Sequence, residues 1–331
     1  MNLLAYFFAL LKGIIYGSTV FFTGALTESS DVLDVLALRF LMSFVVMWLL
    51  KITRIIKIEI SAKDFFVKNP RTPFIRSILL TAIFEPVLYM FFETMGISMT
   101  TGVTAGVILS LSAISSCIVE IIVLKERSGW LQNLFLGLGI FGAIYIAVNG
   151  TTSGEGKDSV LGIVFLLLAI VSGSLFAAFS RKSSKAFSAM EITYVSAMLG
   201  AVAFNAINVV RHLIVGDILH YFDPYFDWSN MVGFVVLAVL STIVATCMNN
   251  YALSKLQLST IAAFNGVSTV VTVAVGVIFG GEKLFFFHAI GLTCIFARMI
   301  GVSAISIYKE RKAKRQGEEG AEKPLTESVP K

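Results

Sequence analysis

Charged residues are scarce in this sequence. Asp, Glu, Lys and Arg make up 14% of its 331 residues, whereas about 25% is usual in a soluble domain. Apolar residues take their place at 56%, with 28 phenylalanines in the chain, and the mean hydropathy is +0.85. This composition excludes a soluble protein of ordinary kind and predicts a protein that crosses a membrane several times.

Cysteine and histidine are rare as well, with three copies of each. Cys117, Cys247 and Cys294 lie within apolar runs and share no metal-ligand spacing, so we interpret them as small hydrophobic residues. The patterns H-E-x-x-H and G-x-S-x-G do not occur, and the G-x-G-x-x-G match at 137–142 lies inside an apolar run and follows no strand. We therefore predict no catalytic residues, no metal and no cofactor, and a protein that is not an enzyme.

Basic residues outnumber acidic ones, 26 to 21, which gives a net charge of +5. Such an excess can indicate nucleic-acid binding, but the Lys and Arg residues gather in a few loops between apolar runs. If both termini are cytoplasmic, the outer loops keep only Lys157, Arg211 and Lys283. This bias predicts that both termini lie in the cytoplasm, that the lipid bilayer is a partner and that nucleic acid is not.

Ten apolar runs have about the 20 residues that a transmembrane helix needs. Several links between them are only a few residues long, so we expect neighbouring helices to form antiparallel hairpins. From residue 309 the chain is polar and charged, which predicts a disordered cytoplasmic tail over 309–331. The predicted spans cover approximately residues 3–26, 33–50, 77–97, 102–124, 131–149, 159–180, 190–210, 231–253, 258–279 and 285–307.

An internal repeat relates the two halves of the chain at an offset of 156 positions. Each half holds five spans, an odd number, so the halves must run in opposite directions through the membrane. The sequence thus predicts an all-α membrane fold of ten helices in two inverted five-helix repeats, 1–150 and 151–308, with a site near the midplane between them. The aligned pairs include Gly17 with Gly173, Ser112 with Ser268 and Glu126 with Glu282.

Several short motifs accompany the repeat: LALRF in span two, Glu126-Arg127 and Glu282-Lys283 after spans four and nine, and FEPVLYMFFE in span three. In this order they resemble the EamA-like branch of the drug/metabolite transporter superfamily, over about residues 3–307. The resemblance implies a bacterial inner-membrane carrier, often an exporter of amino acids or related metabolites. It also implies a central cavity lined mainly by spans 1, 3, 4, 6, 8 and 9. In span nine the chain reads AAFNGVSTVV where many members carry a proline, so no particular substrate is carried over.

Lys12 and Glu85 are charged residues that lie deep in the spans. A charge at the bilayer centre costs at least about 2.5–3.5 kcal/mol, so each needs a partner or a water-filled cavity. Lys12 and Glu85 lie roughly 14 and 12 Å from the cytoplasmic ends of their spans, and we hypothesise that they pair or share a water. Tyr16 and Tyr89 each follow by one turn and share that face, while Pro86 bends span three. We predict that Lys12, Tyr16, Glu85 and Tyr89 bind the substrate.

Further polar residues extend this candidate site. Asn249 in span eight aligns with Glu93 under the offset, and Asn265 lies in span nine; each is a predicted substrate ligand or a hydrogen-bond partner of a neighbouring helix. Arg39 and Glu93 lie level near the outer side and are predicted to form a structural ion pair. A buried carboxylate such as Glu85 is also the natural proton carrier of a coupled transporter, and the sequence leaves proton coupling open.

The segment 211–230 follows the seventh span and is rich in aromatic residues, so we expect it on the outer membrane interface. His212, His220 and Asp217 in it could be read as metal ligands, but polar residues on an interfacial helix are the simpler interpretation. Arg298 in span ten is assigned to helix packing, although it could contact Glu85.

The function that these features favour is a secondary transporter that exports a small metabolite, such as an amino acid, by alternating access. A nucleotide-sugar or lipid-linked-type carrier is the alternative, weakened because Lys12 and Arg298 are the only basic candidates for a phosphate at membrane depth. A channel is a further class. An intramembrane enzyme would need a catalytic set, and no span holds an aspartate at depth. The sequence specifies neither substrate nor oligomeric state.

Overall fold

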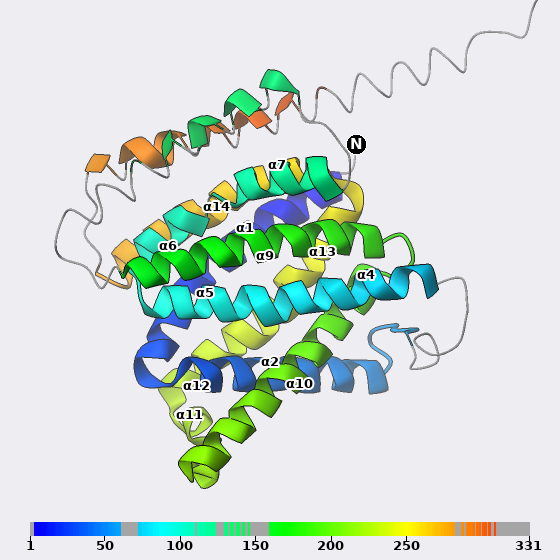
Figure 1. The fold of residues 1–331 in the computed structure, drawn as a ribbon, viewed down its shortest axis with the longest axis vertical. Coiled ribbons are helices and arrows are strands. Elements are labelled where there is room, and N and C mark those ends of the chain that lie inside the picture. Colours follow the sequence, from blue (N-terminus) through cyan, green and yellow to red (C-terminus); the bar gives the residue numbers. More distant parts are fainter. Residues whose placement is uncertain are drawn as a thin grey trace, which may run out of the picture.

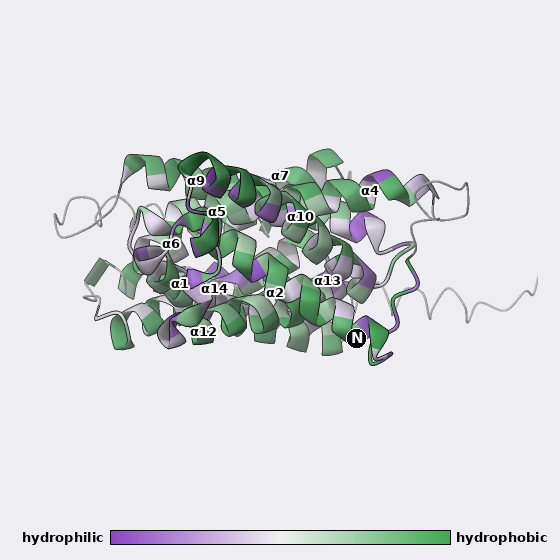
Figure 2. Cartoon of the chain, turned by 90° about the horizontal axis from the view of Figure 1, so that it is seen from below, coloured by the Kyte–Doolittle hydropathy of each residue, from purple (hydrophilic) through white to green (hydrophobic). Residues whose placement is uncertain are grey.

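Helices account for all regular structure in the part of the chain that the computed structural model describes. These residues are 3–60, 72–123 except 110, 159–281, and parts of 129–145 and 286–308. The helices form a bundle (Figure 1) made mostly of hydrophobic residues (Figure 2), and many large hydrophobic side chains are exposed on it. A helix satisfies its own backbone hydrogen bonds, so such a bundle can enter hydrocarbon. The predicted all-α fold is confirmed for this part of the chain.

The first half begins with two long helices, α1 (Leu3–Ser29) and α2 (Val32–Ile52), joined by a tight turn. Asp31 caps α2, because its side chain accepts a hydrogen bond from the Leu33 backbone N–H at 2.9 Å. The short link thus turns the chain back at once, as predicted from the sequence. The other elements of this half are α4 (Thr72–Ala82), η1 (Ile83–Leu88), α5 (Tyr89–Ser98), α6 (Gly102–Leu109) and α7 (Ser112–Val123).

The second half repeats this order, with α9 (Val160–Ser183) and α10 (Ala189–Val215) in place of α1 and α2. Ser188 and Glu191 form a capping box at the start of α10, which satisfies free N–H groups at both positions. The helix ends at Gly216, whose φ of 85° favours glycine. The other elements of this half are η2 (Ile218–His220), α11 (Asp223–Phe226), α12 (Trp228–Val235), η3 (Val236–Ala245), α13 (Thr246–Lys255) and α14 (Leu258–Ile278).

In the described part of the chain six helical stretches are long and apolar enough to cross a membrane, and α14 adds a shorter apolar helix, Phe264–Ile278. They confirm a multi-pass membrane protein, while the count of ten spans stays a prediction. The fifth and tenth predicted spans fall partly outside the described residues; Glu126-Arg127, Glu282-Lys283 and the tail 309–331 fall wholly outside. The six stretches are Leu3–Ser29, Val32–Ile52, Pro73–Ser98, Val160–Ser183, Ala189–Val215 and Asn230–Lys255.

Helices of the two halves pack crosswise. The helix α1 packs on α14 and on η3–α13, whereas α9 packs on α6–α7 and on α4–α5; α2 and α10 pack on each other. Under the offset of 156 positions α1 corresponds to α9, and α14 corresponds to α6–α7. Each helix contact therefore has a counterpart in which a helix of the first half is replaced by its equivalent in the second half, and the reverse. This is expected of two structurally related halves. The opposite orientation of the halves stays a prediction.

The third and eighth spans are interrupted at equivalent places by π-helical segments, η1 and η3. Within η1, Glu85 has the extended dihedral angles φ −141° and ψ 119°, so α4 and α5 meet at a kink. The cause is Pro86, which lacks an N–H and disfavours the α conformation in the residue before it. The predicted bend at Pro86 is confirmed. Such interruptions often lie at functional sites, and both of these border the cavity described next.

Candidate functional site

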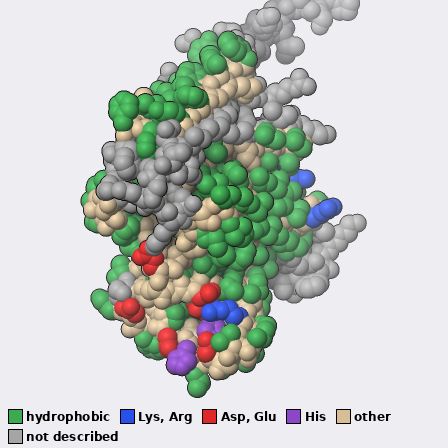
Figure 3. Space-filling model, turned by 60° about the vertical axis from the view of Figure 1, so that its left-hand side comes forward, with side chains coloured by type: hydrophobic (Ala, Val, Ile, Leu, Met, Phe, Trp, Pro, Cys, Tyr) green, Lys and Arg blue, Asp and Glu red, His purple; other side chains and the backbone are tan. Residues whose placement is uncertain are grey.

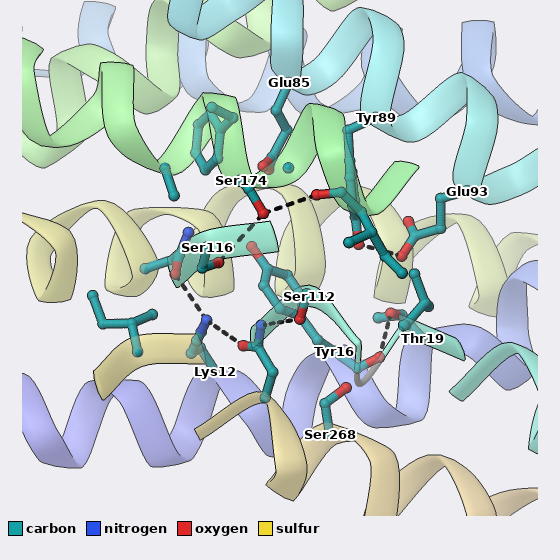
Figure 4. A pocket seen from close by; sticks show the side chains of 18 of the residues that line it. Lys12, Tyr16, Thr19, Glu85, Tyr89, Glu93, Ser112, Ser116, Ser174 and Ser268 are labelled. Atoms are coloured by element: carbon teal, nitrogen blue, oxygen red, sulfur yellow. Dashed lines mark hydrogen bonds between the residues drawn. The ribbon is translucent and has the colours of Figure 1, made fainter. Parts of the chain in front are cut away.

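A cavity of about 120 Å³ lies in the middle of the bundle. Its walls come from α1, η1–α5, α6–α7, α9, η3–α13 and α14, which are spans 1, 3, 4, 6, 8 and 9, the set that the family resemblance implied. Figure 4 shows polar side chains from these elements turned toward one another. The polar lining residues are Lys12, Tyr16, Thr19, Glu85, Tyr89, Glu93, Ser112, Ser116, Ser174, Ser241, Asn249, Asn265, Ser268, Thr269 and Thr272.

Lys12 is the cation of the cavity and is held by two asparagines. Its Nζ donates to Asn249 Oδ1 at 2.9 Å and to Asn265 Oδ1 at 3.0 Å, and Asn265 Nδ2 donates to Ser112 Oγ at 3.0 Å. Lys12 itself is 3% exposed. An ammonium has three donors, so one N–H of Lys12 has no acceptor among the described residues and is left for a group in the cavity. The four residues come from spans 1, 8, 9 and 4, and thus from both halves.

Carboxylates and phenols occupy the side of the cavity formed by span three. Tyr89 donates to Glu93 Oε1 at 2.6 Å, and Glu85 lies one turn before Tyr89 at the kink. Tyr16 on α1 forms a hydrogen bond of 3.1 Å with Thr246 Oγ1. Among the described residues the Glu85 carboxylate has no hydrogen-bond donor, although it lies within electrostatic range of Lys12. The cavity thus presents a cation on one side and two carboxyl groups on the other.

The hydrogen-bond partners of the buried cations differ from those expected from the sequence. Arg39, 2% exposed, donates from Nε to Thr242 Oγ1 and from Nη2 to Ser241 Oγ, both at 2.9 Å. Glu93, its predicted ion-pair partner, accepts from Tyr89 instead. Arg39 and Glu93 lie within electrostatic range of each other, but no direct hydrogen bond joins these two described residues. The reason is that η3 presents two successive hydroxyls to α2, and sequence alone did not indicate a π-helical segment there.

All six residues predicted to bind substrate, Lys12, Tyr16, Glu85, Tyr89, Asn249 and Asn265, line the cavity, and their role in binding stays a prediction. Sequence reasoning missed the serines and threonines of spans 4, 6 and 9. Ser112 and Ser268 carried a usable signal, since the repeat offset aligns them with each other. Arg298 is not among the lining residues; it is buried against Gly139, in keeping with a packing role.

A second polar cluster lies at the C-terminal end of α10 (Figure 3). His212 lies 2.8 Å from Asp34 Oδ1 through Nε2 and 2.7 Å from Asp217 Oδ1 through Nδ1. Asn208 Nδ2 also donates to Asp34 at 2.9 Å, and Arg211 Nη1 lies 3.3 Å from Asp34 Oδ2. His212 is buried and belongs to α10, which continues to Val215; the interfacial placement of residues 211–230 stays a prediction. No metal-binding group was found in the described part of the chain.

The EamA-like transporter family model matches residues 3–148 and 160–304, which is most of the chain. The chain belongs to the EamA-like transporter family. This EamA-like protein is also 32% identical over 313 residues to the "Uncharacterized transporter YcxC" of Bacillus subtilis (strain 168), a match that covers 95% of this chain and 96% of that protein. The protein is therefore a membrane transporter.

A solved crystal structure resembles this EamA-like chain, with a TM-score of 0.63. The match covers 91% of this chain and 98% of that one, at 15% identity, and so concerns the fold alone. The chemistry of substrate recognition in this protein therefore has to be inferred from the residues of its own cavity. In that cavity Lys12 can donate a hydrogen bond to an anionic group, and Glu85 and Glu93 can accept hydrogen bonds from a cationic group.

Proposed function

We propose that this protein is a secondary transporter that exports a small zwitterionic or amphipathic metabolite, such as an amino acid, through the central cavity. The observation that carries the proposal is the separation of charge in the cavity, with Lys12 on one side and Glu85 and Glu93 on the other. A carboxylate would accept from the free N–H of Lys12. An ammonium would lie near the two carboxyl groups, and charge-assisted hydrogen bonds of this kind are stronger than neutral ones.

The apolar part of the same cavity gives room for a hydrophobic side chain of the substrate. Leu109, Ile170, Phe176, Leu253 and Ile261 line it beside the polar groups. A pocket that is mostly apolar with a few convergent polar groups is the usual form of a small-molecule site. A strongly anionic substrate such as a nucleotide sugar fits less well, because Lys12 would have to offset two carboxyl groups as well as the phosphates.

Transport would follow from the two halves moving relative to each other. The proposed repeats, 1–150 and 151–308, would carry ten spans and run in opposite directions, so that rocking exposes one central site to each side in turn. Both termini would be cytoplasmic in the bacterial inner membrane. The π-helical interruptions η1 and η3 would act as the bending points, since each joins two shorter helices beside the cavity. Glu85 would carry a proton if transport is coupled to the proton gradient.

The test starts with the metabolites of cells. We expect overproducing cells to release one class of small metabolite in excess, and deletion cells to accumulate it. Purified protein in proteoliposomes should then show saturable counterflow of that compound, faster with a proton gradient if Glu85 is the coupling group. Glu85→Gln should weaken the response to the gradient, whereas the buried Ser172→Ala, which lies outside the cavity lining, should not change it. Non-saturable flux would indicate a channel and contradict the proposal.

A further inference from the structure

A second, smaller chamber lies behind the kink of span three. Its walls come from α2, η1–α5, α10 and η3–α13, and its volume is about 10 Å³. Gly200 lets α10 come close on this side, because a Cβ there would lie 2.6 Å from Pro86 Cγ. Glu85 and Met90 line both this side chamber and the central cavity. The side chamber is lined by Phe40, Glu85, Pro86, Met90, Thr193, Ser196, Ala197, Thr242 and Thr246.

The three threonine hydroxyls of the side chamber already give their protons to backbone carbonyls. Thr193 donates to Ala189, Thr242 to Leu237 and Thr246 to Ser241. Each also has a second partner, Asn250, Arg39 and Tyr16 respectively. A hydroxyl has one donor and two acceptor positions. The threonines therefore offer at most one acceptor position each and no donor.

Two residues that line the side chamber have hydrogen-bonding capacity left over. Ser196 Oγ is buried and has no hydrogen-bond partner in the described part of the chain, and the residue is 5% exposed. The Glu85 carboxylate likewise lacks a donor among the described residues. Buried polar groups in proteins are nearly always paired, with protein or with ordered water. Ser196 can supply a proton and Glu85 can accept one, and both line the same small space.

We propose that the side chamber is a binding site for one ordered water molecule, held by Ser196 and Glu85. A buried water needs about 10–15 Å³ and two to four polar partners, and the side chamber provides both. The water accepts from Ser196 Oγ and donates to Glu85 and to a threonine oxygen. A cation of similar size is disfavoured, because the Arg39 guanidinium donates to Thr242, which is part of the chamber wall.

The site gives Glu85 a polar partner on the side away from the central cavity. A water can both donate and accept, so it serves the carboxylate in its ionised and its protonated form alike. Glu85 thus stays hydrogen-bonded when a solute fills the central cavity and expels the water there. This consequence rests on the proposed transport function, whereas the water site itself does not.

The direct test is a structure of the full-length protein in lipid at a resolution that shows ordered water. We expect one density peak about 2.7–3.2 Å from Ser196 Oγ and from a Glu85 oxygen. Ala197→Val should fill the side chamber and remove the peak. A side chamber without a peak would overturn the proposal. So would a peak with several oxygens closer than hydrogen-bond distance, which changes when sodium is exchanged for potassium, because that would be a cation.

A second measurement works without crystals. Brief radiolysis in heavy-oxygen water oxidises side chains next to bound water, and Met90 is the most easily oxidised wall residue. We expect severalfold less heavy oxygen on Met90 in Ser196→Ala and in Ala197→Val than in the wild type. Ser172→Ala is the matched control, since Ser172 is an equally buried serine that donates to a backbone carbonyl.

Because Met90 also borders the central cavity, the comparison between variants is diagnostic rather than the level of oxidation itself. Equal incorporation in the wild type and in both chamber variants would mean that no bound water of the side chamber lies next to Met90, and it would refute the water site. A failed transport assay would leave this measurement unaffected, so the two proposals can fail separately.

Discussion

Lys12 Nζ donates to Asn249 Oδ1 at 2.9 Å, which joins the first helix of the chain to the eighth span in the other half. Lys12 and Asn249 both line the central cavity, so their contact crosses the boundary between the two halves at the candidate site. A hydrogen bond to a charged group contributes about 1.5–3 kcal/mol. The position of the ammonium therefore depends on a residue more than two hundred positions away in the sequence.

Asn249→Leu should lower the affinity for the exported substrate about tenfold or more, because Lys12 loses one of its two fixed acceptors and turns away from the cavity. The measurement is the concentration dependence of counterflow in proteoliposomes. In a Lys12→Met background the same substitution should change little further. Equal losses in both backgrounds would mean that Asn249 acts independently of Lys12.

Lys12 and Glu85 should be coupled in transport. Glu85→Gln and Lys12→Ala should each impair transport, and their combination should differ from the sum of the single effects by about 0.5–3 kcal/mol. The reason is that the two charges face one cavity and share its water and its substrate. The measurement is a double-mutant cycle on counterflow rates. Strict additivity would refute a functional link between the two residues.

Gly17 should be required for the contact between α1 and α14. A Cβ at this position would lie 2.5 Å from the Ser268 carbonyl oxygen, and Thr272 Oγ1 donates to the Gly17 carbonyl at 2.9 Å. Gly17→Ala should therefore lower stability by about 1–3 kcal/mol, the usual cost of overpacking, measured by thermal unfolding in detergent. Gly137→Ala is the matched control, because a Cβ there meets nothing within 4 Å; equal losses would contradict the packing argument.

The polar cluster at the C-terminal end of α10 should make stability depend on pH. His212 faces carboxylates with both ring nitrogens, and a neutral imidazole can donate to only one of them. The folded protein thus holds a proton that an unfolded histidine releases near pH 6.5, so this stability is present at acidic pH and should fall as the pH rises from below 6.5 to above it. Asp34, Asp217, Arg211 and Tyr221 are the charged and titratable groups around the ring.

Thermal unfolding across this pH range is the measurement for His212. His212→Gln should remove most of the pH dependence and lower stability at acidic pH by about 1–3 kcal/mol. His220→Gln is the matched control, because His220 also contacts an aspartate but is exposed. If the control abolishes the pH dependence and His212→Gln does not, the dependence comes from the loop and not from the buried cluster.

Single cysteines should reveal the orientation in the membrane. In a background without the three native cysteines, Leu219→Cys should react with an impermeant maleimide added to intact cells, and Ile55→Cys should react only after the cells are opened. Both side chains are exposed, so access to the thiol is not limiting. The opposite labelling pattern would place the termini outside and reverse the proposed export geometry.

The order of helices in each half could be predicted from the sequence, because a segment that crosses hydrocarbon must be apolar and long enough to span it. Runs of about 20 apolar residues must become spanning helices, and short links such as the one at Asp31 must turn the chain back. The bend at Pro86 follows from local chemistry alone, whereas the membrane depths of Lys12 and Glu85 stay predictions. These features need no knowledge of which helices are neighbours, so sequence was enough to predict them.

Partners across helices could not be found in this way. The sequence placed Lys12 beside Glu85 and Arg39 beside Glu93 because they lie at equal depth, but depth leaves the rotation of each helix open. Packing turned Lys12 toward Asn249 and Asn265, and the π-helical segment η3 brought Ser241 and Thr242 to Arg39. The burial of His212 and the side chamber behind Glu85 depend on the same rotations. Composition thus determined a multi-pass membrane protein, and the packing of helices from both halves decided which polar groups meet inside it.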